Sequence, residues 1–338
     1  MGLGSRSLLY YAIVILVIVD MAVAVYAVFE GPFPSRVTLG TPIAYKNIYL
    51  HVPIAVSTYV LFAGALLASI LYLWRGDRRL VAYVDSFVTY GILFGAATLV
   101  TGSAWASESW GTAWNWDPKE TAVLLLFISY LMYYPLKRSI SDPERRDRIG
   151  AVYAIAAFTM VPLSFLASRI IESLHPTTGA VSSFTQGGIG GAILGVRILL
   201  VMSVGVMLAL ARVKGVSLPR QLASIVVVVG VLVALYVAYP IVGGDSYRVL
   251  GATVDDNGYI YSIELSNGRV IWFDKPVPPP IEPPLTADGV STLVTHIVKI
   301  NDGSIEVLYH WSTPFALTIY SLLLSIGIIV VGRRGEGG

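Results

Sequence analysis

The sequence predicts an all-α polytopic membrane protein of about eight transmembrane helices, with a small extracytoplasmic β-domain inserted before the last helix. Three observations support this fold class. Charged residues make up 13% of the 338-residue chain, against about 25% in soluble proteins, and the mean hydropathy is +0.72. Several apolar runs are each long enough to cross a bilayer. Short β-branched and aromatic segments, separated by turn signals, occupy residues 242–313.

The apolar runs define the helical part of the chain. A helix needs about 20 apolar residues to cross the hydrocarbon core. The first run has no clear cleavage site and is longer than the apolar part of a signal peptide, so we interpret it as a span. The predicted spans are 8–29, 48–73, 81–103, 119–136, 149–171, 188–211, 221–241 and 314–332.

The distribution of positive charge predicts the orientation. Alternate loops contain 14 Lys and Arg residues in one set and eight in the other, and the eight are spread over longer loops. Because cytoplasmic loops are enriched in Lys and Arg, both termini are expected in the cytoplasm of a plasma-membrane protein. The segments expected outside are 30–47, 103–118, 172–187 and 242–313.

The region 242–313 is expected to fold as a separate β-domain outside the membrane. Asn267-Gly268 is one of several turn signals in it. A proline-rich stretch from Pro276 to Pro284 divides the region and is expected to be an extended linker. The predicted strands are Ser246–Val254, Tyr259–Leu265, Arg269–Phe273, Leu293–Ile300 and Ser304–Tyr309.

The composition excludes several functions. The chain contains no cysteine, which rules out disulfides, thiolate metal ligands and covalent attachment of haem to a cysteine of this chain. No phosphate-binding loop, dinucleotide fingerprint, His-Glu-x-x-His motif or hydrolase triad is present. Nothing indicates a nucleic-acid partner, and the lipid bilayer is the expected environment.

The segment Trp110-Gly-Thr-Ala-Trp114-Asn-Trp116-Asp117-Pro118 is the most informative motif. It holds three of the chain's seven tryptophans. Gly111 permits close backbone approach, and Asp117 before a proline is typical of a helix start. A shelf of fixed geometry suits a large, flat ligand such as a porphyrin. The alternative is an aromatic belt at the membrane surface, which also accounts for Trp74 and Trp105.

Two histidines are placed at the same outer boundary as the tryptophan segment. His51 lies at the start of the second predicted span, and His175 follows the fifth. Two neutral imidazoles facing each other can hold haem iron from both axial sides. Each histidine alone could be an ordinary interfacial residue. Together, on one side and flanking three tryptophans, they favour a pair of iron ligands.

Two arginines are candidates for pairing with haem propionates. Arg169 lies near the end of the fifth span, and Arg197 lies inside the sixth, where a cation needs a partner or a cavity. Arg169 could instead extend to the membrane surface. Arg197 could instead pair with a carboxylate. The candidates are Glu172, Glu108 and Glu120. His296 and His310 are expected to have structural roles.

The motif resembles that of a known family. Trp110 to Thr121 is similar to the tryptophan-rich signature of the cytochrome c maturation proteins that handle haem, the CcmC, CcmF and CcsA group. Leu50-His51-Val52-Pro53 resembles the first external histidine segment of that group. Val161 to Phe165, followed by Ser173-Leu174-His175, resembles the second, especially as it occurs in CcmC. The resemblance covers about residues 1–212, a six-span core. The remaining parts are the seventh span 213–241, the β-domain 242–313, and the eighth span with a cytoplasmic tail, 314–338.

The resemblance implies a function in cytochrome c biogenesis. It implies that haem b is bound transiently, with His51 and His175 as axial iron ligands. Trp110, Gly111, Trp114, Trp116 and Asp117 would then bind the macrocycle, with Arg169 near a propionate. In the CcmC branch, haem passes to the membrane-anchored chaperone CcmE, and ABC-transporter subunits release the loaded chaperone. In the CcsA branch, haem is exported and attached directly to apocytochrome c.

The two branches can be weighed from the residues. Asp117-Pro-Lys-Glu120 is closer to CcsA, but CcsA and CcmF also use a histidine inside the span after the tryptophan segment, and residues 119–136 contain none. This difference favours CcmC and a haem-transfer factor rather than a conventional enzyme. A membrane electron-transfer cytochrome would need histidine pairs within the spans. A solute transporter would need broken helices and polar groups at the midplane.

Overall fold

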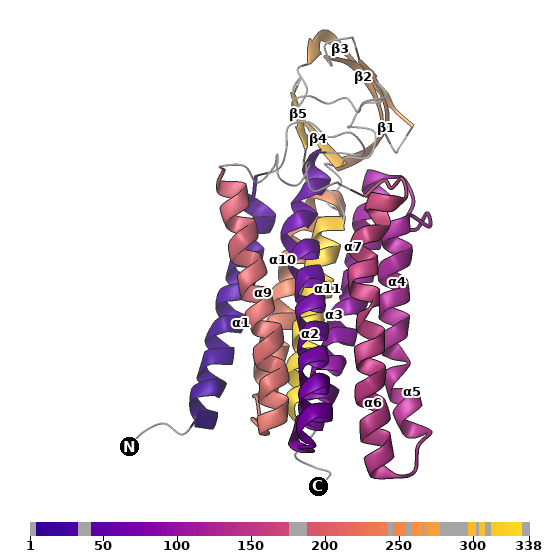
Figure 1. Cartoon of the computed structure of the whole chain (residues 1–338). Helices are drawn as coiled ribbons and strands as arrows, with labels where there is room; N and C mark the ends of the chain where they lie inside the picture. Colours follow the sequence, from indigo (N-terminus) through magenta and orange to yellow (C-terminus); the bar gives the residue numbers. More distant parts are fainter. Residues whose placement is uncertain are drawn as a thin grey trace.

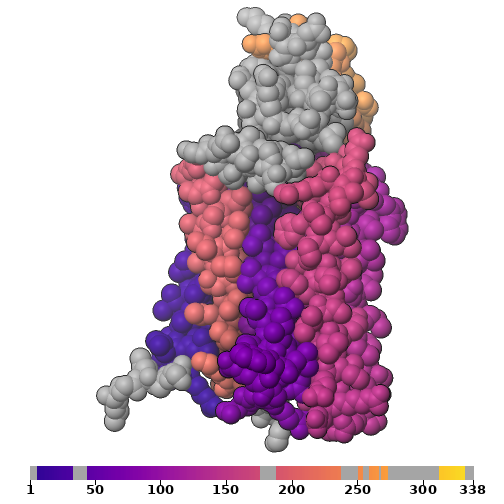
Figure 2. All heavy atoms as spheres, in the orientation of Figure 1, coloured from indigo at the N-terminus to yellow at the C-terminus, as the bar shows by residue number. Residues whose placement is uncertain are grey.

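The computed structural model describes residues 5–32, 42–175, 188–242, 246–254, 259–265, 268–277, 297–301, 304–307 and 312–332. Its helices form a bundle, and a five-stranded sheet lies at one end of that bundle (Figure 1). On the face shown in Figure 2, α2 lies between α9 and the α6–α7 pair. His296, His310 and the residues of the proline-rich stretch after Val277 lie outside the described ranges.

The helices fall where the apolar runs predicted them. Six segments are long and apolar enough to cross a membrane, counted over the described residues, which confirms a polytopic membrane protein. The helices are α1 Ser5–Glu30, η1 Pro42–Asn47, α2 Ile48–Arg75, α3 Arg79–Ser109, α4 Pro118–Leu131, α5 Tyr133–Arg138, α6 Pro143–Phe158, α7 Met160–Ile170, α9 Ile189–Lys214, α10 Arg220–Val242 and α11 Ser312–Gly332.

Two of the predicted spans are not single helices. The run 119–136 is divided into α4 and α5 at Met132, and the run 149–171 is divided into α6 and α7 at Thr159. Each break lies three residues before a proline, Pro135 or Pro162. A proline lacks the N–H that would bond the carbonyl four residues earlier, and its ring crowds that carbonyl, so the helix is interrupted there.

A proline also explains how Arg197 is held inside the bundle. Pro53 cannot donate to the carbonyl of Tyr49, four residues earlier on α2, and Arg197 Nε donates to that oxygen at 3.2 Å. The guanidinium of Arg197, on α9, also pairs with Asp20 of α1, which accepts a hydrogen bond from Tyr320 of α11. All three side chains are fully buried. Arg197 therefore pairs with Asp20 and with none of the three glutamates considered from the sequence.

The last helix lies among the others rather than beside them. α11 packs against α1, α3, α9 and α10. In the apolar stretch of α11, 61% of the residues are buried inside the protein, a larger share than in the other five candidate spans of the described chain. Tyr90 of α3 donates to the carbonyl of Gly327 at 2.8 Å. The C-terminal helix thus contributes to the same core as the N-terminal ones.

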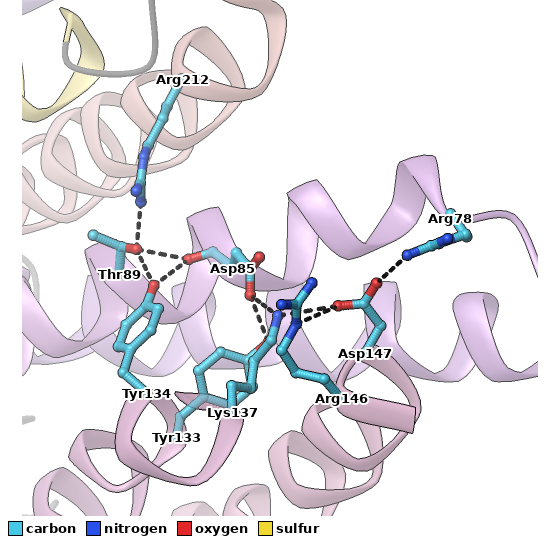
Figure 3. Close-up of polar contacts among 9 residues, drawn as sticks. All are labelled: Arg78, Asp85, Thr89, Tyr133, Tyr134, Lys137, Arg146, Asp147 and Arg212. Carbon is cyan, nitrogen blue, oxygen red and sulfur yellow. Dashed lines mark hydrogen bonds and ion pairs between the residues drawn. The ribbon is translucent and has the colours of Figure 1, made fainter. Parts of the chain in front are cut away.

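A network of charged side chains ties the helices together at the end opposite the sheet (Figure 3). Asp85 of α3 accepts hydrogen bonds from Lys137 and Tyr133 of α5, both at 2.7 Å. Lys137 also lies 3.7 Å from Asp147 of α6, which pairs with Arg78 at 3.2 Å. These contacts fix the α5–α6 pair against α3.

The sheet confirms a strand within each of the five predicted segments, while residues 293–296 and 308–309 of two of them lie outside the described ranges. Its strands are β1 Ser246–Val254, β2 Ile260–Leu265, β3 Val270–Val277, β4 Ile297–Asn301 and β5 Ser304–Val307. Their order is β3-β2-β1-β4-β5, and each neighbouring pair is antiparallel. Asn267 of the predicted Asn267-Gly268 turn lies outside the described residues, but Gly268 has a φ of +80° that favours glycine, and its N–H donates to Leu265 O at 2.9 Å. Strand β3 extends four residues further than predicted, through Pro276.

Candidate functional site

A cavity of about 470 Å³ lies between the ends of the helices nearest the sheet. Its walls come from η1, the first half of α2, the last turns of α3, the tryptophan segment, the start of α4 and residues 173–175. Both candidate histidines line it. The volume falls within the range of about 300–1,000 Å³ typical of small-molecule sites.

Three residues of α3 fix the ring of His51. His51 is 8% exposed, and its Nδ1 lies 3.0 Å from Thr101 Oγ1. The Thr101 hydroxyl donates its hydrogen to Ala97 O at 2.7 Å, so it accepts the Nδ1–H of His51, leaving Nε2 with a free lone pair. Trp105 meets the ring edge to face at 6.0 Å. A Cβ on Gly102 would lie 2.9 Å from His51 Cε1, so only glycine leaves room for the ring.

His175 reaches the cavity from the segment that follows α7. Its ring meets Trp110 edge to face, with centroids 6.1 Å apart. Its Nδ1 is buried and has no hydrogen-bond partner within the described part of the chain. Burial, and to a smaller extent the charge of Lys119, lower the pKa of His175 to about 4, while the charge of Asp117 partly opposes the shift. The imidazole is therefore neutral at physiological pH and can act as a ligand.

Asp117 joins the tryptophan segment to the segment that carries His175. Its Oδ1 accepts the backbone N–H of Lys119 at 2.8 Å, which is the predicted helix cap. Its Oδ2 accepts the hydroxyl of Ser173 at 2.7 Å and the N–H of Leu174 at 2.8 Å. Ser173 Oγ in turn accepts the N–H of His175 at 3.1 Å. The sequence predicted the cap, but the contacts with Ser173 and Leu174 depend on the fold.

The tryptophans divide into two groups. Trp110 and Trp114 line the cavity, as expected. Trp116 does not line it: this residue is 70% exposed, has a φ of +63°, and packs edge to face on Trp114 at 5.8 Å. Trp105, assigned from the sequence to the aromatic belt, lies in the cavity wall. Trp105 lies one helical turn after Thr101, so both side chains are on the same face of α3.

Gly111 has a conformational role in this segment. Its φ of +78° lies in the left-handed region that glycine adopts without strain. A Cβ at this position would meet nothing within 4 Å. The glycine is therefore needed to turn the chain after α3, rather than for the close approach that the sequence suggested.

Lys119, rather than Arg169, brings positive charge to the cavity. Of the described residues lining it, Lys119 alone carries a cation. Its Nζ donates to Ser164 O at 2.8 Å and lies 4.6 Å from the centroid of the Phe165 ring. Arg169 is exposed and lies outside the lining. Arg197 also lies outside it, in the buried pair with Asp20.

The residues of the cavity fit an iron porphyrin. His51 and His175 would supply the two axial ligands that bis-histidine haem requires, and the buried Nδ1 of His175 lacks any other partner among the described residues. Aromatic walls suit the flat macrocycle. The cavity has a volume of about 470 Å³, and the lysine in its wall suits a ligand with an anionic edge.

Comparison with known proteins places the site in a family. Residues 4–175, half of the chain, match the family described as cytochrome C assembly protein. The chain belongs to this family. The matched part begins at the start of α1 and ends at His175, so it includes every residue that lines the cavity. Helices α9, α10 and α11 and the sheet follow the matched part.

Several relatives with curated names match part of the chain. "Heme exporter protein C" of Rhodobacter capsulatus is 31% identical over 123 residues, 36% of this chain and 51% of the relative. The protein of that name from Escherichia coli K12 is 29% identical over 133 residues, 39% and 54%. A "putative cytochrome c biosynthesis ccmC-like mitochondrial protein" of Marchantia polymorpha is 37% identical over 140 residues, 41% and 58%. The chain therefore spans about half the length of the relatives it matches.

Proposed function

We propose that this protein takes part in cytochrome c biogenesis by binding haem b as a cargo in this cavity and passing it to a partner. The observation that carries the proposal is that His51 and His175, from distant parts of the sequence, line one aromatic-walled cavity. Nδ1 of His51 is held by Thr101 Oγ1, and the buried Nδ1 of His175 has no hydrogen-bond partner among the described residues. The relatives' names, which refer to haem export and cytochrome c biosynthesis, support the same function.

Different side chains would bind different parts of the haem. His51 Nε2 and His175 would hold the iron from opposite sides, while Trp110 and Trp114 contact the macrocycle. Lys119, which lines the cavity, replaces Arg169 as the proposed partner of a propionate. Haem would be held by two iron ligands and by apolar contacts, with no covalent bond between the porphyrin and the protein. The complex can therefore release its cargo.

We further propose that the recipient is a CcmE-like haem chaperone served by ABC-transporter subunits. The region where the CcsA and CcmF groups have an intramembrane histidine holds buried tyrosines here: Tyr130 stacks on Phe62 at 3.6 Å, and Tyr133 donates to Asp85. The alternative is a CcsA-like role, in which haem is attached directly to apocytochrome c, and the closeness of Asp117-Pro-Lys-Glu120 to that group favours it.

The proposed orientation has the cavity and the sheet on the outer face of the plasma membrane, with both termini in the cytoplasm. The helix ends and loops that line the cavity lie at the end of the bundle nearest the sheet (Figure 1). The opposite end carries the dense group of basic residues drawn in Figure 3, which suits the cytoplasmic side. Those residues are Arg78, Lys137, Arg146 and Arg212.

Haem titration of histidine variants tests the proposed function. His51→Ala and His175→Ala should each weaken haem binding by about tenfold or more, because each removes an axial ligand. Free imidazole, which can enter the vacated space, should restore part of the affinity. Ser69→Ala is a matched control, since Ser69 is buried on the same helix as His51 but lies outside the cavity lining. Equal haem affinity in wild type and both histidine variants would refute the assignment.

The recipient can be identified with the same preparations. Haem-loaded wild-type protein is mixed separately with a CcmE-like chaperone and with apocytochrome c, and haem is followed by absorbance after separation. Transfer to the chaperone supports the CcmC-like role. Covalent haem on the cytochrome, without the chaperone, supports the alternative.

A further inference from the structure

The first residue of α11 is bound directly to the framework of the cavity. Ser312 is fully buried. Its backbone N–H donates to Glu108 Oε1 at 2.7 Å, and its hydroxyl accepts a hydrogen bond from Asn47 Nδ2. Both partners are buried as well. Ser312 therefore joins α3 to the end of η1, although it lies more than 200 residues away from each in sequence.

The two elements that Ser312 joins carry cavity walls. Asn47 is the last residue of η1, whose Tyr45 lines the cavity, and it directly precedes the helix that carries His51. Glu108 lies in the last turn of α3, between Trp105 and Trp110. The Tyr45 and Trp105 rings meet edge to face at 5.5 Å, and Trp105 meets His51 at 6.0 Å. A shift of either element would move the wall around His51.

Electrostatics favour the contacts of Ser312 with Glu108 and Asn47, which together form a joint between α11, α3 and η1. The first N–H groups of a helix have no partner within the helix and carry partial positive charge. The Glu108 carboxyl oxygen that accepts the N–H of Ser312 satisfies a donor that the helix itself leaves unpaired. Pro314, two residues on, cannot donate to the preceding turn, so the helix cannot begin earlier without losing a bond.

We propose that the first turn of α11 is a positioning element of the haem cavity, with Ser312 and Glu108 as its positioning residues. The proposal rests on the proposed haem-binding function. It also assigns a role to the C-terminal part of the chain, because α11 lies beyond the residues that match the family.

Only four residues separate α11 from the last strand of the sheet. A displacement of the sheet would therefore be transmitted to Ser312.

Hydrogen exchange on the haem-free, full-length protein tests the joint without reference to haem. The variants are Ser312→Ala, which removes the bond to Asn47, and Glu108→Gln, which replaces the carboxyl group with an amide of the same shape. Backbone exchange in residues 42–47 and 104–110 should become about tenfold faster in each variant. Ser325→Ala is the matched control. It removes a buried hydroxyl of the same helix that donates to Ala223 O at 3.0 Å, far from the cavity.

Haem binding by the same variants tests whether the joint positions the site. Ser312→Ala and Glu108→Gln should lower haem affinity by about tenfold and alter the low-spin spectrum, while Ser325→Ala should change neither. Unchanged exchange in 42–47 and 104–110 would overturn the proposal, as would faster exchange with an unaltered haem complex. If wild-type haem binding proved independent of His51 and His175, the proposed function would fail. Exchange alone would then decide whether α11 holds these two segments.

Discussion

At the scale of single residues, the space beside His51 is a sensitive feature of the site. Gly102 lies against the imidazole, and a Cβ there would approach Cε1 to 2.9 Å. Gly102→Ala should therefore displace the ring and lower haem affinity by about tenfold, the size of effect that loss of a ligand's support produces. Haem titration measures this. Gly195→Ala is the control, because a Cβ on that helical glycine meets nothing within 4 Å. Equal affinities in the two variants would contradict the account.

The pKa of His175 predicts how binding responds to acid. Burial lowers it to about 4, so the ring stays neutral as the pH falls from 8 to about 5. Protons compete with iron for this ligand only near pH 4 and below, rather than near 6.5, where an ordinary histidine is protonated. Haem retention measured by absorbance across that range should remain constant to about pH 5. A loss of haem centred near pH 6.5 would contradict this prediction.

Some residues that the sequence singled out line the cavity, and other lining residues were overlooked. His51, His175, Trp110 and Trp114 line one cavity, but whether they bind haem stays a prediction. Trp116 and Arg169, assigned to the same site, lie outside the lining. Trp105, which was assigned to an aromatic belt, and Lys119, which was given no role in the site, both line it. Which face of a helix meets the cavity depends on packing between helices, and no local pattern encodes that.

At the scale of elements, Asp117 couples α4 to the segment that carries His175. Asp117→Asn leaves one carbonyl oxygen where two carboxylate oxygens now accept three hydrogen bonds. We expect faster exchange of the Leu174 and His175 amides and haem binding weaker by about tenfold, with unchanged helix content by circular dichroism. Unaltered exchange at these two amides would show that Asp117 does not hold the segment.

The sequence predicted some elements better than others, and the reason is local. The strands from β1 to β5 are short, β-branched and bounded by turn signals, so their positions followed from the sequence. The breaks between α4 and α5 and between α6 and α7 were not predicted, because hydropathy registers an apolar run and ignores its hydrogen bonds. Pro135 and Pro162 were visible signals of both breaks.

At the scale of the whole molecule, the buried group of Asp20, Arg197 and Tyr320 joins α1, α9 and α11. Removing one member leaves a buried charge without its partner, at a cost of about 3–5 kcal/mol. Arg197→Met should therefore lower the thermal unfolding temperature in detergent sharply. The double variant Asp20→Leu, Arg197→Met should recover much of the loss. A single variant as stable as wild type would refute this role.

The way the chain is assembled could not be derived from its linear order. The sequence divided it into a six-span core followed by a tail, and that division stays a prediction. In the folded protein, α11 lies among α1, α3, α9 and α10. The position of Arg197 inside a predicted span indicated that it needs a partner. Asp20 could be identified as that partner only once α1 and α9 were known to be neighbours.

The most direct test of the central claim is the absorption and electron paramagnetic resonance spectrum of purified, haem-loaded protein. Wild type should show six-coordinate, low-spin haem with two histidine ligands. His51→Ala and His175→Ala should each lose that signature, and the double variant should lose most of its haem. A double variant that retains the wild-type spectrum would contradict the account, because the iron would then be held by other residues.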